Sequence, residues 1–173
     1  MPTETIHGSV GTNGLTCEQI WHAIKKASFA VLSEVNGDGE PRSSGVVYET
    51  LGRRMYVAVG SDSWKAKHIA AHGRIAVTVT VRRGGLLSLV FPIPPATVSF
   101  QAKATVRPLG APENRAIEKK LMSLVPPEVR DETSIIEIVP EGSFLTYGIG
   151  VPLMKMRDTQ AARARVPVRG EER

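Results

Sequence analysis

Basic and hydroxyl side chains gather in two segments of this sequence. The first, residues 60–69, follows a strand-like apolar run and begins a predicted helix that carries Lys65 and Lys67 in its first turn. The second, residues 41–47, is itself strand-like and begins with Arg42 and two serines. Backbone N–H groups at a helix start, hydroxyls and cations are the groups that bind phosphate. The two segments therefore predict a site for a phosphate-bearing cofactor, and a flavin is the one we expect.

Hydrophobic periodicity and turn residues predict the elements that position this site. Thr16 and Gln19 form a capping-box pattern at the start of a helix that extends to about residue 27. The segment 36–39, Asn-Gly-Asp-Gly, is a strong hairpin signal between two strands. The predicted strands are 29–35, 42–49, 55–59, 75–81, 97–107, 135–139 and 144–149, with further helices over 63–71 and from Pro112 to about 125. We expect the first three strands to form a meander.

About seven strands with hairpin-like connections favour a mainly β protein, an antiparallel barrel with peripheral helices. Neither G-x-G-x-x-G nor a Walker A motif occurs, so a Rossmann or P-loop site is not expected. We expect a flexible arm over residues 1–14, one cofactor-binding domain over 15–150 and a basic extension over 151–173. The apolar loop 86–95 and the strand ending at Tyr147 are expected to form a substrate wall.

Composition argues against several classes of function. The net charge is +5, but much of it lies in the last 23 residues, so nucleic-acid binding is not expected. One cysteine excludes an internal disulfide and a cysteine metal cluster. His68 and His72 have metal-compatible spacing, but no second ligand pair accompanies them, so no metal site is expected. No apolar run reaches the roughly 20 residues of a membrane helix, and no signal-peptide pattern is visible, so we expect a cytoplasmic protein.

The order of these segments resembles the FMN-binding split barrel of the pyridoxamine 5′-phosphate oxidase superfamily. The residues that carry the resemblance are a strand, the 36–39 hairpin, the segment 41–47, a second strand, the segment 63–69 and a third strand. It covers residues 29–107 well, and 15–28 and 133–150 more loosely. The resemblance implies a six- to seven-stranded antiparallel split β-barrel that forms a homodimer, with FMN at the dimer interface and hydride transfer to or from a small organic substrate.

Matching positions imply roles for individual residues. Arg42 and Lys65 would bind the FMN phosphate, and Gln101 would reach the ring from the neighbouring subunit. Trp64 stands where the oxidase commonly has an arginine, and Lys67 or Ser61 would replace that contact. The full set of implied cofactor-binding residues is Arg42, Ser43, Ser44, Gly45, Val46, Val47, Val59, Ser61, Ser63, Trp64, Lys65, Lys67 and Gln101. No catalytic side chain is implied.

Other functions remain open from the sequence. The C-terminal Trp-Arg-Leu motif of the oxidase is absent, so the resemblance does not imply pyridoxamine phosphate as the substrate. The same superfamily includes reductases that use the deazaflavin coenzyme F-420, whose polyglutamate tail Lys67, Lys103 and the terminal arginines could bind. A third alternative is a non-enzymatic protein that binds flavin or haem.

Overall fold

The computed structural model describes residues 14–83, 93–110 and 115–168. Most of the predicted loop 86–95, residue Pro112 and nearly all of the N-terminal arm lie outside these ranges. The helices are α1 (Cys17–Lys26), α2 (Trp64–His72) and α3 (Arg115–Met122), with 3-10 helices over Pro127–Glu132 and Leu153–Arg157. The strands are β1 (Phe29–Val35), β2 (Pro41–Val47), β3 (Glu49–Leu51), β4 (Arg54–Gly60), β5 (Arg74–Val81), β6 (Ala96–Arg107), β7 (Thr133–Tyr147) and β8 (Arg163–Pro167).

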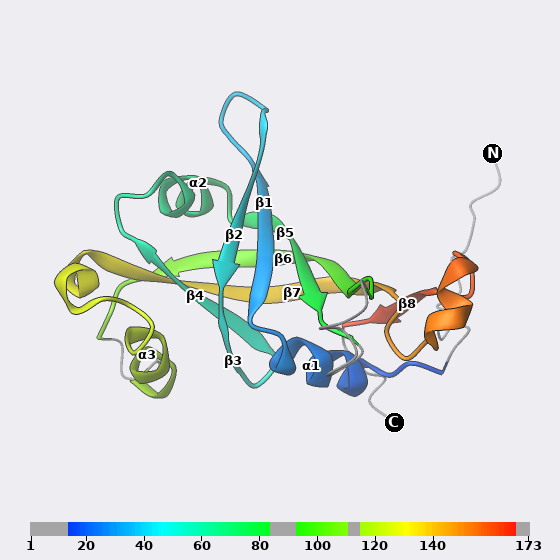
Figure 1. The fold of residues 1–173 in the computed structure, drawn as a ribbon. Coiled ribbons are helices and arrows are strands. Elements are labelled where there is room, and N and C mark those ends of the chain that lie inside the picture. Colours follow the sequence, from blue (N-terminus) through cyan, green and yellow to red (C-terminus); the bar gives the residue numbers. More distant parts are fainter. Residues whose placement is uncertain (1–13, 84–92, 111–114, 169–173) are drawn as a thin grey trace.

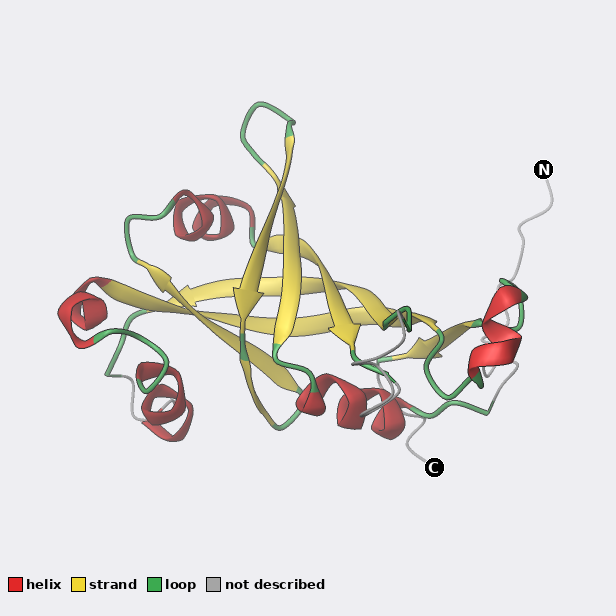
Figure 2. Cartoon of the chain, in the orientation of Figure 1, coloured by secondary structure: helices red, strands yellow, loops and turns green. Residues whose placement is uncertain are grey.

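The strands form one curled antiparallel sheet, so the expected mainly β barrel-like architecture is confirmed. Seven strands follow the order β2-β1-β5-β6-β7-β4-β3, and β8 pairs with β7. The long strands β6 and β7 run through the middle, and the β1–β2 hairpin projects beyond them (Figure 1). Helices α2 and α3 lie toward one end of these strands, while α1 lies nearer the end that carries β8 (Figure 2). Among the described residues, no helix is long and apolar enough to cross a membrane.

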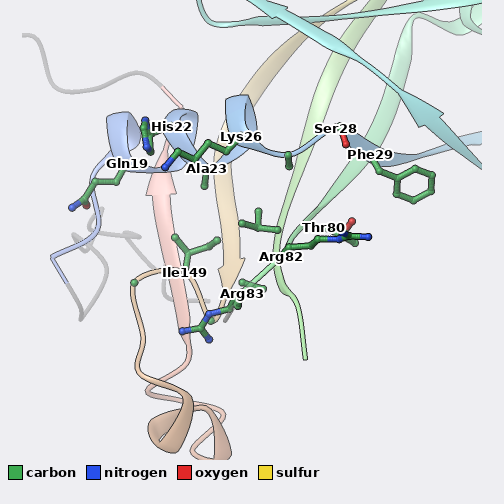
Figure 3. Close-up of a pocket in the computed structure, with 15 residues that line it drawn as sticks. Gln19, His22, Ala23, Lys26, Ser28, Phe29, Thr80, Arg82, Arg83 and Ile149 are labelled. Carbon is green, nitrogen blue, oxygen red and sulfur yellow. The ribbon is translucent and has the colours of Figure 1, made fainter. Parts of the chain in front are cut away.

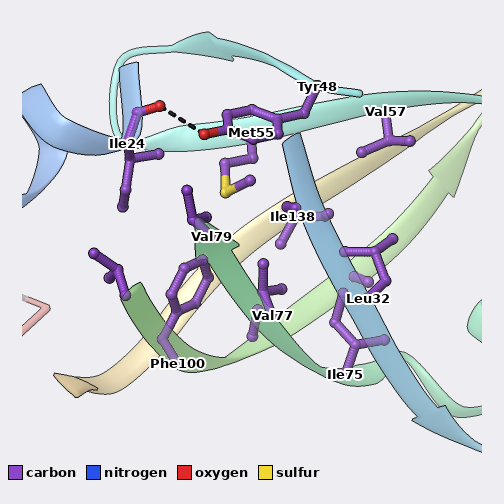
Figure 4. Close-up of a cluster of buried hydrophobic side chains, with 14 of the residues drawn as sticks. Ile24, Leu32, Tyr48, Met55, Val57, Ile75, Val77, Val79, Phe100 and Ile138 are labelled. Atoms are coloured by element: carbon purple, nitrogen blue, oxygen red, sulfur yellow. Dashed lines mark hydrogen bonds between the residues drawn. The ribbon is translucent and has the colours of Figure 1, made fainter. Parts of the chain in front are cut away.

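The main core lies inside the curl of the sheet (Figure 4). Helix α1 begins at the predicted capping box and presents Ile20 and Ile24, both fully buried, to this core. The Tyr48 hydroxyl, between β2 and β3, donates a 2.6 Å hydrogen bond to the carbonyl oxygen of Ile24. Because both partners are buried, this bond ties the helix to the sheet where water cannot compete.

Two expectations about strand pairing are wrong. Strand β4 does not complete a meander with β1 and β2; it pairs with β3 and β7. The predicted strands 135–139 and 144–149 are parts of the single strand β7. The pairing of β7 with β6 continues through Pro140, which pairs with Ala102. An irregularity between Ser99 and Gln101 of β6 shifts the register, and the pairing resumes beyond it. Neither outcome follows from local periodicity.

The basic C-terminal segment contributes a strand. Within the predicted extension 151–173, β8 pairs with β7 along the register Ser143–Pro167 to Tyr147–Arg163. The backbone N–H of Val168 then donates to the carbonyl of Gly142. The boundary at residue 150 stays a prediction, but the chain beyond it belongs to the same sheet.

Buried Glu137 on β7 predicts a pH dependence of stability. Its carboxylate accepts hydrogen bonds from Arg54 and Arg107. Burial raises the pKa of Glu137, but the bonds from Arg107 and Arg54 outweigh it and hold the pKa below its ordinary value. A lowered folded-state pKa stabilises the fold above the unfolded-state pKa, and this contribution is lost as the pH falls through the folded-state pKa. Urea unfolding should therefore show that wild-type stability falls more steeply than that of Glu137→Gln below about pH 5. An equal fall in the free energy of unfolding with pH for the two proteins would contradict this prediction.

Candidate cofactor site

Strand β2 separates its predicted site residues onto two faces. Successive side chains of a strand point to opposite sides, so Arg42 and Ser44 share one face and Ser43 projects from the other. There the Ser43 hydroxyl lies 2.8 Å from the hydroxyl of Ser33 on β1. The Ser44 hydroxyl is buried and has no hydrogen-bond partner. A buried polar atom without a partner is costly, so Ser44 is a candidate for ligand contact, whereas Ser43 already has a partner.

The segment between β4 and α2 holds the other predicted hydroxyls. Ser63 caps α2, since its hydroxyl accepts a 3.2 Å hydrogen bond from the backbone N–H of Ala66. The backbone N–H of Ser61 donates to the carbonyl of Glu132, and its hydroxyl lies 2.7 Å from that of Ser134. These contacts fix the chain where it leaves the sheet and position Lys65 in the first turn of α2.

Trp64 brings Arg42 and Lys65 together. The Arg42 guanidinium carbon is 5.7 Å from the centre of the indole ring, and the Lys65 ammonium nitrogen is 5.8 Å from it. Both cations therefore lie near the same ring, although Arg42 belongs to β2 and Lys65 belongs to α2. None of the ion pairs among the described residues involves Arg42 or Lys65. The arrangement places two cations near one ring without an ion-pair partner among the described residues, and cations in this state are available to an anion.

A partly buried hydrogen-bond contact between Glu34 and His68 supports α2 beside this cluster. The Glu34 carboxylate on β1 lies 3.1 Å from Nδ1 of His68, and the His68 ring centre is 5.8 Å from that of Trp64. Arg42 is the cross-strand partner of Glu34. Arg42 and Glu34 of the sheet and Trp64 and His68 of α2 therefore lie around the same corner of the molecule. Among the described residues, no group of three or more His, Cys, Asp or Glu side chains is placed to hold a metal ion.

Two adjoining cavities lie next to the basic cluster. One, of about 240 Å³, is lined by Lys65 and by residues 45–47 of β2. The other, of about 290 Å³, is lined by Val59, Ser61 and Ser63. Ala58 and Val125 line both cavities, so the two are neighbours. Seven of the thirteen predicted site residues line one or the other, whereas Arg42, Ser43, Ser44 and Trp64 line neither.

Lys67 and Gln101 lie apart from this region. The Lys67 ammonium is 4.0 Å from Asp62, and both side chains are exposed, so water and salt screen the pair. Gln101 on β6 lines a separate cavity of about 300 Å³, together with Glu141 and Arg165. The role of Gln101 toward a neighbouring subunit stays a prediction.

One wall of the cleft was missed by the sequence interpretation. Leu121, Leu124 and Val125, from α3 and the turn after it, line the cavity beside Lys65. The apolar spacing in this segment predicts a helix, but it does not indicate which strands the helix covers. Contacts between α3 and the β3–β4 hairpin place it there. The cavity beside Lys65 thus combines one cation with aliphatic side chains. Arg42 reaches this region through Trp64, which both cations contact, and the unpaired Ser44 hydroxyl does not line either cavity.

Comparison with known proteins supports the fold. No family model matches the sequence, and no curated protein matches it. Its structural neighbours are split-barrel proteins like pyridoxamine 5′-phosphate oxidase, at low sequence identity, so the expected split-barrel fold is confirmed.

Three neighbours illustrate the range. A FAD-binding protein from Mesorhizobium loti is 14% identical with a TM-score of 0.58, over 73% of this chain and 91% of that one. An F-420 reductase is 18% identical with a TM-score of 0.53, over 71% and 93%. The haem storage protein HutZ from Vibrio cholerae is 11% identical with a TM-score of 0.62, over 78% and 97%. At these identities the likeness shows the fold alone.

Proposed function

We propose that this protein is a flavin-dependent oxidoreductase that binds FMN and transfers hydride to or from a small organic substrate. The observation that carries the proposal is the convergence of Arg42 and Lys65 on Trp64, beside the cavity lined by residues 45–47 of β2. Both cations lack a carboxylate partner among the described residues. A phosphate monoester carries nearly two negative charges near neutral pH and would supply what these side chains lack.

The remaining site residues have separate tasks under this proposal. The unpaired Ser44 hydroxyl would hydrogen-bond to the bound cofactor. The backbone of residues 43–47 would offer N–H and C=O groups to its ring and side chain. Leu121 and Leu124 would exclude water from the apolar face of the ring. When bound, the cofactor supplies the hydride chemistry, and the protein supplies position and electrostatics. No side chain in the cleft is assigned as an acid or base.

We further propose that the site forms between two copies of the chain. Phe29 and Val47 are cross-strand partners on the β1–β2 hairpin, and their side chains are 45% and 54% exposed. Val35, on the same strand, is 53% exposed. A second copy would cover this apolar face and could bring Gln101 to the cleft. Sedimentation velocity at micromolar concentration should show a dimer, and a monomer would contradict this part of the proposal.

Two alternative functions are compatible with the same fold. One structural neighbour is an F-420 reductase, and a deazaflavin would present a phosphate to the same cations. Another neighbour is a haem storage protein, which corresponds to a non-enzymatic binder.

Titration of the purified protein with FMN, coenzyme F-420 and haem in turn would separate these functions. Our proposal predicts saturable binding of FMN, with the absorption bands of bound flavin, and turnover of a reductant by the loaded protein. Tight binding of F-420 with none of FMN would favour the deazaflavin reductase. Binding of haem alone, without turnover, would favour storage or sensing.

A further inference from the structure

A cavity of about 780 Å³ lies away from the candidate cofactor cleft, between α1, the end of β5 and the turn 148–150 (Figure 3). We infer that it binds a small organic anion, that is, a largely apolar molecule carrying carboxylate or phosphate groups. The inference goes beyond the proposed function, because none of the residues assigned to the cofactor lines this cavity. Of the residues on the proposed dimer face, Phe29 lies at its edge and lines it.

The charged side chains that line the cavity all have one sign. Lys26 belongs to the last turn of α1, while Arg82 and Arg83 follow β5 on the facing side (Figure 3). His22 adds an imidazole from α1, and no aspartate or glutamate is among the described lining residues. None of the ion pairs found in the described ranges involves Lys26, Arg82 or Arg83. Three cations therefore border one space without a compensating carboxylate.

Arg83 is the most informative of these cations because it is partly buried. Its guanidinium donates to the carbonyl oxygen of Val151 and to the sulfur of Met156, which are both neutral. These contacts hold the side chain in place but leave its charge unbalanced. A charge that is withdrawn from water is normally paired, so Arg83 is poised for an anion that enters the cavity.

The rest of the lining determines the kind of anion. Ala23 and Ala27 on α1, Val81 on β5 and Ile149 on the turn are apolar. A volume of about 780 Å³ lies within the range of cavities that enclose small organic ligands. A cation at a helix C-terminus can simply complement the helix dipole, which would account for Lys26. It does not account for Arg82 and Arg83, which directly follow β5 and belong to no helix.

The probe for this site is anilinonaphthalene sulfonate, an apolar dye with one anionic group, and N-phenylnaphthylamine is its neutral counterpart. The test variant is Lys26→Gln/Arg82→Gln. The matched control is Lys25→Gln/Arg74→Gln, which removes the same charges from exposed residues of α1 and β5 that do not line the cavity. Fluorescence titration gives the affinity of each dye, and circular dichroism verifies the fold.

The charged dye should bind the wild-type protein saturably and bind the test variant at least about tenfold more weakly, because two charge-assisted contacts are lost. The control variant should bind it like wild type, and the neutral dye should bind all three proteins equally. Absence of saturable binding, unchanged affinity in the test variant, or equal loss in the control would overturn the inference.

The same titrations separate this inference from the proposed function. Arg42→Ala/Lys65→Ala protein should retain the charged dye, and Lys26→Gln/Arg82→Gln protein should retain FMN. Failure of the wild type to bind FMN while the dye result holds would overturn the proposed function alone. Failure of the dye result while FMN binds would overturn this inference alone.

Discussion

Replacement of Arg42 and Lys65 together with alanine is expected to weaken FMN binding by at least about 100-fold. Both cations lie against Trp64 and have no carboxylate partner among the described residues. A hydrogen bond to a charged group contributes about 1.5–3 kcal/mol, and each 1.4 kcal/mol is a factor of ten in affinity. Titration of flavin fluorescence would measure the change.

The variant Lys25→Ala/Arg74→Ala is the matched control. It removes one lysine and one arginine that are exposed and line neither cavity of the cleft. Its FMN affinity should stay within about twofold of wild type, since distant exposed charges are screened by salt. Equal losses in the two double variants would mean that only net charge matters, and the assignment of Arg42 and Lys65 would be wrong.

Phe144→Ala is expected to lower the free energy of unfolding by about 3–5 kcal/mol. Phe144 on β7 is fully buried. Its ring packs edge-on against Trp21 of α1, with centroids 5.9 Å apart, and against Phe100 of β6 at 5.3 Å. The substitution removes one of the contacts that join α1 to the sheet and leaves a cavity between them. Urea denaturation of both proteins would measure the loss.

Leu145→Ala is the control for the core, because it is the next residue on the same strand and its side chain is 50% exposed. It should cost no more than about 1 kcal/mol. Comparable losses at the two positions would contradict the inward orientation of Phe144 and, with it, the register of β7.

Elements with local signals were predictable from the sequence. The capping box at Thr16 and Gln19 forms as expected, and α2 starts after Ser63 and ends at Gly73, which adopts a left-handed conformation. The pairing of β4 with β7 was not predictable, because partners 73 to 83 residues apart leave no mark on local periodicity. Strand β8 was missed for a related reason, since its arginine-rich sequence reads as a polar tail and only β7 gives it a partner.

The candidate site also has parts that the sequence predicts and parts that it does not. Residue type and position predicted that Arg42 and Lys65 belong to one site, because each lies beside hydroxyls on its segment. The structure places both near the Trp64 ring, and their role as phosphate ligands stays a prediction. The aliphatic wall from Leu121 and Leu124 depends on where α3 lies on the sheet. The cavity bordered by Lys26 and Arg82 likewise arises from segments distant in sequence. Residue types that can bind an anion are visible in the local sequence, whereas the cavity walls around them arise from tertiary packing.

The central claim is that the two cations bind a phosphate, and comparison of FMN with riboflavin tests it most directly. Riboflavin has the same ring and ribityl chain but no phosphate. Wild-type protein should bind FMN at least about 100-fold more tightly than riboflavin, and Arg42→Ala/Lys65→Ala should lose most of that preference while keeping its affinity for riboflavin. Equal affinity of the wild type for the two flavins, or a preference that survives in the double variant, would contradict the account.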